Sequence, residues 1–158
     1  MTDPAVREPA PKASAARTRL GSYAICLDAD GRILLCRLAT GEPEPGAWTL
    51  PGGGVDFGEH PDDAVIRELR EESGLNGEIV ELEGVFSHLY AGSPYADGAD
   101  LHFLGVLYRV NVTGGELTDE VEGSTDRCGW FARDEVRGLR IVSVARDAIE
   151  RIWPGALE

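Results

Sequence analysis

The sequence predicts an α/β fold, because apolar runs typical of strands enclose one amphipathic helix and a second helix lies near the C-terminus. The chain has 158 residues, 42% of them hydrophobic, which suits one domain with a buried core. Residues 1–19 are rich in Pro, Ala and charge and contain no apolar segment. We therefore expect a disordered tail over residues 1–19, neither signal peptide nor membrane span, and a single domain over residues 20–158.

The first part of the domain is expected to form a hairpin followed by a loop. Apolar runs at residues 20–27 and 32–38 flank the turn signal Asp-Ala-Asp-Gly at residues 28–31. Residues 39–47 contain two prolines and two glycines, which predict a loop, and residues 48–50 predict a short strand. The glycine run that begins at Gly52 would let the backbone come close to a ligand.

The central helix is expected to begin at Pro61, since proline suits the first helical position, with His60 placed to cap it. It should end near Ser73, with Gly74 in the left-handed cap conformation. Ala64, Val65 and Leu69 supply its buried stripe.

Three further strands and a final helix complete the domain. The strand-like segments are residues 79–90, 101–112 and 128–131, and the last helix spans about residues 144–153 with Ser143 as its cap. Strands that enclose one helix, with the second helix covering the far side, make an α/β sandwich.

An acidic cluster on the central helix indicates metal chemistry. Glu68, Glu71 and Glu72 are spaced i, i+3 and i+4, so they share one helical face and repel one another. A divalent cation would offset this repulsion, and all-oxygen sites suit Mg²⁺ together with substrate phosphates.

The segment from Gly53 to Leu75 resembles the Nudix box, G-x5-E-x7-R-E-U-x-E-E-x-G-U with U bulky and apolar. Every fixed position is met, by Gly53, Glu59, Arg67, Glu68, Leu69, Glu71, Glu72, Gly74 and Leu75. The box covers 23 of 158 residues, and the flanking pattern is similar to the Nudix family from about residue 20 to 153. The resemblance implies a Nudix-like α/β/α sandwich with a mixed central sheet and the Nudix helix at about residues 61–73.

The resemblance also implies a reaction. The family hydrolyses nucleoside diphosphates linked to another group, with Mg²⁺ or Mn²⁺, by attack of water on phosphorus. It assigns metal binding to Glu68, Glu71 and Glu72, with the Gly52 carbonyl as a further ligand. For the general base it leaves open Glu68, Glu71 or a glutamate from a later loop. Glu122 fits that loop position best, and Glu120 is the alternative.

Other box residues are expected to support the site. Arg67 adjoins Glu68 but points about 100° away on a helix, so we expect it to pair with Glu59 from the preceding loop. That ion pair would hold the turn at Gly53 against the metal site, while Gly74 ends the helix.

Four residues are candidates for substrate binding. Trp48, Tyr90 and Tyr95 are suited to stacking on a nucleobase, with core packing as the alternative for each. The two tyrosines flank the loop at residues 91–100, which has the composition of an exposed substrate-side loop. Arg37 is suited to a phosphate oxygen, with a surface ion pair as the alternative.

Two functions from different classes follow. The first is a pyrophosphohydrolase acting on a nucleoside triphosphate or an ADP-ribose-type substrate. The second is a non-catalytic nucleotide-binding or sensor module, which the complete box disfavours because such modules resemble the family with a damaged box.

Charge and cysteine content restrict the partners and the compartment. A net charge of −13 disfavours polymeric nucleic acid and anionic membranes as partners, but leaves room for a small nucleotide bound through a metal. Cys26, Cys36 and Cys128 have no framework spacing, so we expect reduced thiols and a cytoplasmic protein. A homodimer is left open, since members of the family are often dimers.

Overall fold

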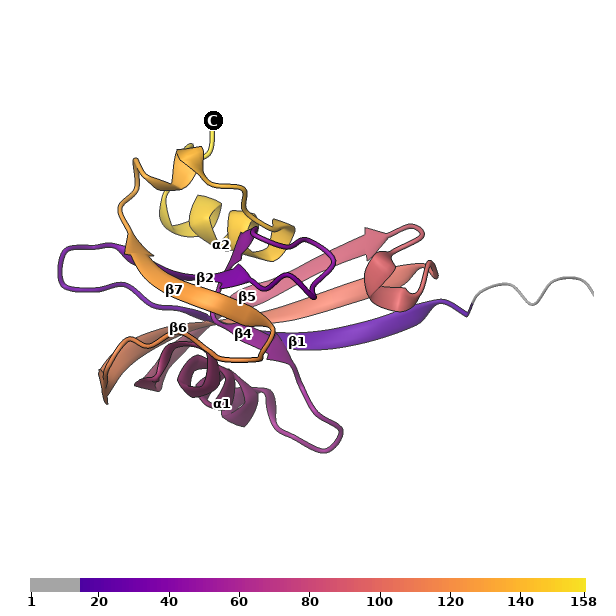
Figure 1. The fold of residues 1–158 in the computed structure, drawn as a ribbon, viewed down its shortest axis with the longest axis horizontal. Coiled ribbons are helices and arrows are strands. Elements are labelled where there is room, and N and C mark those ends of the chain that lie inside the picture. The colour runs from indigo at the N-terminus through magenta and orange to yellow at the C-terminus, as the bar shows by residue number, and fades with distance from the viewer. Residues whose placement is uncertain (1–14) are drawn as a thin grey trace, which may run out of the picture.

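The computed structural model describes residues 15–158, whose strands and helices are joined by loops (Figure 1). The strands are β1 (Arg17–Ile25), β2 (Ile33–Leu38), β3 (Trp48–Thr49), β4 (Gly52–Gly54), β5 (Leu75–Tyr90), β6 (Leu101–Gly115) and β7 (Thr125–Phe131). The helices are α1 (Pro61–Ser73) and α2 (Ser143–Ile152), with short 3-10 helices at Pro94–Ala96 and Val136–Gly138. The expected α/β class is therefore confirmed.

The strands form two sheets. The larger has the order β4-β1-β6-β5, in which β1 runs parallel to β6 and the other neighbours are antiparallel. The smaller has the order β3-β2-β7 and is antiparallel. The mixed sheet expected from the resemblance is thus present.

The two helices lie on opposite sides of the strands (Figure 1). Helix α1 buries Val65 and Leu69 in a cluster with Leu34 of β2 and Val110 of β6. Helix α2 packs in a second cluster that includes Ile149. Full burial of one such aliphatic side chain contributes about 1.5–3 kcal/mol. No helix within residues 15–158 has the length and apolar character needed to cross a membrane.

Local signals set both ends of α1. Pro61 takes the first helical position, and His60 Nδ1 accepts a hydrogen bond from the Asp62 backbone N–H at 3.1 Å. Gly74 adopts a left-handed conformation with φ 74° and donates its N–H to the Arg70 carbonyl at 2.9 Å. The helix ends where its sequence predicts, and this fixes the rotation of the acidic face.

Several expected boundaries differ from the structure, among them the starts of β5 at Leu75 and of β7 at Thr125, which precede the expected residues 79 and 128. Strand β1 begins at Arg17, inside the expected tail, because it pairs with β6 from Arg17 opposite Leu101 onward. Residues 1–14 of that tail lie outside the described residues. Ser143 is the first residue of α2 rather than its cap, since Val142 occupies the cap position without a side-chain hydrogen bond.

The cysteine prediction was wrong for two of the three residues. Cys36 of β2 and Cys128 of β7 are directly opposite one another in the antiparallel register, and their sulfurs form a disulfide. Cys26 is a buried free cysteine, as expected for a small apolar side chain. Because 92 residues separate the paired cysteines, spacing along the sequence could not reveal the contact. Cysteine usage therefore no longer argues for a reducing compartment.

Candidate active site

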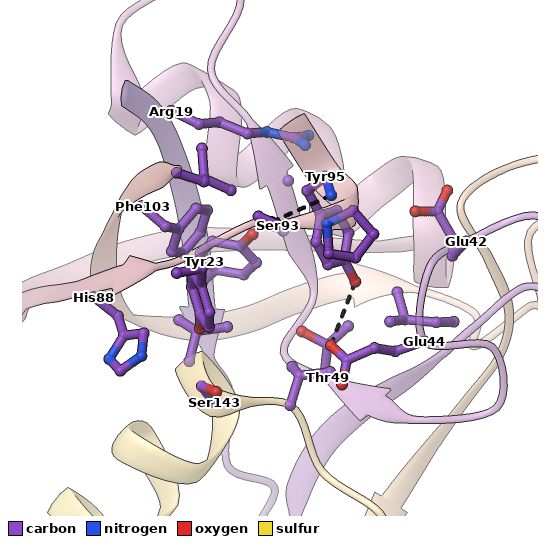
Figure 2. Close-up of a pocket in the computed structure, with 18 of the residues that line it drawn as sticks. Arg19, Tyr23, Glu42, Glu44, Thr49, His88, Ser93, Tyr95, Phe103 and Ser143 are labelled. Atoms are coloured by element: carbon purple, nitrogen blue, oxygen red, sulfur yellow. Dashed lines mark hydrogen bonds between the residues drawn. The ribbon is translucent and has the colours of Figure 1, made fainter. Parts of the chain in front are cut away.

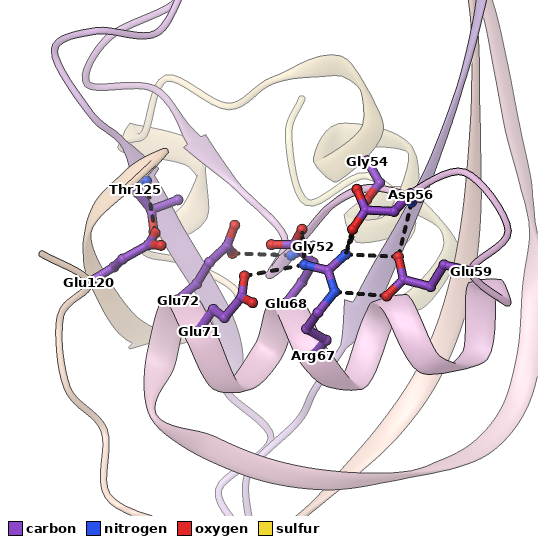
Figure 3. Close-up of polar contacts among 10 residues, drawn as sticks. All are labelled: Gly52, Gly54, Asp56, Glu59, Arg67, Glu68, Glu71, Glu72, Glu120 and Thr125. Carbon is purple, nitrogen blue, oxygen red and sulfur yellow. Dashed lines mark hydrogen bonds and ion pairs between the residues drawn. The ribbon is translucent and has the colours of Figure 1, made fainter. Parts of the chain in front are cut away.

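An arginine at the centre of the acidic face joins α1 to the loop before it (Figure 3). Arg67 Nε donates to Glu59 Oε1 at 2.7 Å, and Arg67 Nη2 donates to Glu59 Oε2 at 2.9 Å. Glu59 Oε2 also accepts the Asp56 backbone N–H at 3.0 Å. These hydrogen bonds, those from Arg67 first, lower the pKa of Glu59 to about 2. The ion pair expected from the sequence is present, and it closes the turn onto the helix.

Arg67 does not point away from Glu68, as its position on the helix suggested. Its Nη1 lies 2.9 Å from Glu68 Oε1 and 3.3 Å from Glu71 Oε2, and its Nη2 lies 3.4 Å from the Gly54 carbonyl oxygen. The long side chain bends back over the acidic face, so the angle between adjacent Cβ atoms does not decide its contacts. Arg67 therefore links the loop carboxylate to two of the three helix carboxylates.

Glu72 is the most buried carboxylate of the cluster, with 1% of the residue exposed. Its Oε2 accepts the backbone N–H of Gly52 at 3.1 Å. Burial raises the pKa of Glu72 well above its usual range, and the nearby charge of Glu68 adds to the effect. A cation beside this carboxylate would offset both costs.

Glu68 approaches the glycine strand so closely that a side chain there would collide with it. A Cβ built at Gly53 would lie 2.9 Å from Glu68 Oε1, and one at Gly52 would overlap the Ser22 carbonyl oxygen. Burial raises the pKa of Glu68, with Arg67 acting in the opposite direction. Gly52 therefore has to be a glycine because the β1 backbone lies against it, whereas a side chain at Gly53 would displace the Glu68 carboxylate.

The two candidate loop acids differ in position. Glu122 is exposed and has a left-handed backbone with φ 59°. Glu120 accepts hydrogen bonds from the backbone N–H and the hydroxyl of Thr125, at 3.3 and 2.9 Å, and its charge helps to raise the pKa of both Glu68 and Glu72. The structure thus places Glu120, not the preferred Glu122, beside the acidic face.

The donor set fits a hard divalent cation. As the side chains stand, no three His, Cys, Asp or Glu residues within residues 15–158 are grouped to hold a metal, and Arg67 occupies oxygens of Glu68 and Glu71. The available donors are nevertheless all oxygen, and burial makes the charged forms of Glu68 and Glu72 costly in the absence of a cation. Mg²⁺ and Mn²⁺ favour such carboxylates.

A cavity of about 570 Å³ opens directly beside this cluster (Figure 2). Gly52, Gly53 and Glu72 are among its lining residues. Its other lining residues include the aromatic side chains of Tyr23, Tyr90, Tyr95 and Phe103. Two of these, Tyr90 and Tyr95, were expected to contact substrate, and the structure brings both to the cavity.

The other two expected substrate contacts lie elsewhere. Trp48 is 9% exposed and packs edge-on against Phe131 at a ring separation of 4.8 Å. Arg37 Nε bonds Asp126 Oδ1 at 2.8 Å, and its guanidinium lies 6.0 Å from the Trp48 ring centre. Neither lines the cavity, so core packing explains Trp48 and an ion pair explains Arg37.

Three charged residues of the cavity were missed in the sequence. Arg19 was counted with the tail, although Arg19 and Tyr23 are four residues apart on a strand and so share one face. The alternation of side chains along a strand was therefore the sequence signal that could have placed Arg19 beside Tyr23. Glu42 and Glu44 come from the loop between β2 and β3, where no periodicity predicts direction.

Comparison with known proteins agrees with this geometry. The NUDIX domain family matches residues 17–152. A MutT NUDIX hydrolase structure from Burkholderia pseudomallei superposes with a TM-score of 0.72 and 33% identity, over 86% of this chain and 98% of that one.

Two relatives with assigned activities match more narrowly. An ADP-ribose pyrophosphatase from Methanocaldococcus jannaschii is 37% identical over 91 residues, 58% of this chain and 50% of the relative. The nucleoside triphosphatase NudI from Escherichia coli O139:H28 is 42% identical over 71 residues, 44% of this chain and 50% of the relative. The matched region thus spans about half the length of each. From the family match over residues 17–152 and the shared fold, the chain belongs to the NUDIX domain family.

Proposed function

We propose that this protein is a metal-dependent hydrolase that cleaves a pyrophosphate bond in a nucleoside diphosphate linked to a further group. The observation that carries the proposal is that the buried Glu72 and Gly52, which donates a hydrogen bond to it, both line the 570 Å³ cavity. A diphosphate bound there would meet the carboxylates that a divalent cation is needed to balance.

Glu68, Glu71 and Glu72, with the Gly52 carbonyl, would hold Mg²⁺ or Mn²⁺. When bound, the cation neutralises pyrophosphate charge and lowers the pKa of a coordinated water. Arg67 and Glu59 hold the loop and the helix face in register, and so act as positioning residues.

In the reaction a water oxygen bonds to phosphorus while the bond from phosphorus to the bridging oxygen breaks. A carboxylate takes the proton of the attacking water, and the leaving phosphate carries away the electron pair. Glu68 and Glu71 remain candidates for this base. Of the two loop acids we propose Glu120, because its charge reaches Glu68 and Glu72.

The substrate class is a small nucleotide, either a nucleoside triphosphate or an ADP-ribose-type compound. The names of the relatives support both alternatives. The aromatic side chains that line the cavity suit the base of either compound.

The test is chromatographic separation of the products formed from a mixed panel of nucleoside triphosphates and ADP-ribose-type compounds with Mg²⁺, Mn²⁺ or a chelator. We expect turnover only with a cation, and a loss of about 10²-fold or more in Glu72→Gln with the fold retained. Glu81→Gln, which removes an exposed charge on β5, is the matched control. Absence of turnover for every nucleotide would favour the non-catalytic binding module. A normal rate in Glu72→Gln would place the cation elsewhere.

A further inference from the structure

Two carboxylates that the proposed reaction does not use, those of Glu42 and Glu44, also line the cavity. Neither forms an ion pair with a Lys, Arg or His side chain within residues 15–158. The polar contact of Glu44 is with the Tyr95 hydroxyl, which donates to Glu44 Oε2 at a distance of 3.5 Å. This bond is long, so the carboxylate is free to turn toward a better donor.

The negative charges of both carboxylates act on the Tyr95 hydroxyl. Burial raises the pKa of Tyr95 to about 12, and the charges of Glu44 and Glu42 add to the rise. The hydroxyl therefore stays protonated and continues to donate. Figure 2 shows Tyr95, Glu42 and Glu44 on one side of the view, with Tyr23 and Phe103 on the other.

Acidic groups at this place exclude a phosphate from it. Their negative charge would repel the diphosphate that we assign to the side of the cavity beside Glu72. Arg19, the cation among the lining residues, is close to the glycine strand, since a Cβ built at Gly54 would lie 3.4 Å from its Nη2, and its charge also reaches Tyr95. Two carboxylates outweigh this one arginine, so the side of the cavity near Tyr95 is suited to a neutral group that presents hydrogen-bond donors between aromatic walls.

A carboxylate accepts hydrogen bonds and donates none, so it discriminates among nucleobases. Guanine presents a ring N–H and an amino group side by side, and these two donors match the two oxygens of one carboxylate. Adenine and cytosine offer an amino group next to a ring acceptor. Uracil and thymine place carbonyl oxygens beside their single ring N–H, and these oxygens repel a carboxylate.

We propose that Glu44, assisted by Glu42, is a specificity-determining residue that accepts hydrogen bonds from the base of the substrate and selects guanine over uracil and thymine. This inference rests on the proposed function, because it takes the base to lie near Tyr95 when the diphosphate is bound beside Glu72.

The test is kcat/KM for GTP, ATP, CTP and UTP in the wild type, Glu44→Gln and Glu42→Gln. We expect the wild type to favour GTP over UTP by about 10–100-fold, the discrimination typical of one bidentate contact. Glu44→Gln should reduce that ratio by roughly tenfold, since an amide also donates to a carbonyl oxygen. Glu42→Gln should reduce it less. Glu81→Gln on β5 is the control and should leave the ratio unchanged.

Binding of non-hydrolysable guanosine and uridine triphosphate analogues, measured by calorimetry on the same variants, separates the two levels of inference. Absence of turnover on all four triphosphates, together with guanosine-selective binding that Glu44→Gln abolishes, would overturn hydrolysis of triphosphates and support the base assignment. Equal affinity for both analogues, a preference for another base, or a ratio unchanged in Glu44→Gln would overturn the base assignment and leave the reaction standing.

Discussion

Buried charge at single residues explains why the candidate site needs a ligand. Glu72 is almost fully enclosed, and its hydrogen bond from Gly52 recovers only part of the hydration that it lost. Natural proteins keep such a carboxylate when it is neutralised by a proton, a cation or a partner. The surrounding glutamates make a cation the partner that accounts for the whole cluster.

At this scale the two loop acids can be separated by experiment. Glu120→Gln should lower kcat by about 10²-fold or more, because its carboxylate is the one beside the acidic face, and should change KM little. Glu122→Gln, the matched control two residues along the same exposed loop, should stay within a few-fold of the wild type. Steady-state kinetics of both variants shows which of the two loop acids acts in the reaction. Normal rates in both would return the base to Glu68 or Glu71.

Residue identities in the acidic cluster could be predicted because their chemistry is local to one helix. Tyr90 and Tyr95 could also be predicted, since they flank one loop. Arg37 and Trp48 could not, because their partners Asp126 and Phe131 lie on another strand. No local pattern in the sequence reports such a neighbour.

At the scale of elements, α1 and the loop before it behave as one unit held by the pair of Arg67 and Glu59. The helix could be predicted closely since proline, histidine and glycine at its ends act within a few residues. The extension of β1 to Arg17 depends on pairing with β6, which is far along the chain, so it could not be predicted.

The loop-to-helix pair makes stability depend on pH in a defined direction. The pKa of Glu59 falls from about 4.5 to about 2 on folding, so its stabilising effect is complete above about pH 4.5 and is lost as the pH falls toward 2. We expect the free energy of unfolding of the wild type to exceed that of Glu59→Gln by a constant amount near neutral pH. The difference should shrink below about pH 4.5.

Denaturant unfolding of both proteins across this range measures the effect. A difference that does not change with pH would show that Glu59 stabilises the loop through contacts unrelated to its charge.

At the scale of the whole molecule, the disulfide links two strands of the smaller sheet, β2 and β7, and lies next to the candidate active site. Cys128 Sγ lies 3.2 Å from the carbonyl oxygen of Glu72, at the end of α1. The bridge therefore connects β2, β7 and the helix that carries the acidic face, three parts that no local signal in the sequence associates.

Thiol counting tests this arrangement directly. Unfolded without a reductant, the protein should present one reactive thiol, Cys26, and three after reduction. A Cys128→Ala control should present two thiols without reduction, because Cys36 loses its partner. Reduction should also lower the free energy of unfolding by about 2–4 kcal/mol, as expected when a long loop in the unfolded chain is released. Three thiols without reductant would show that Cys36 and Cys128 are adjacent but unbonded, and β2 and β7 would then be held together by their backbone ladder and apolar contacts.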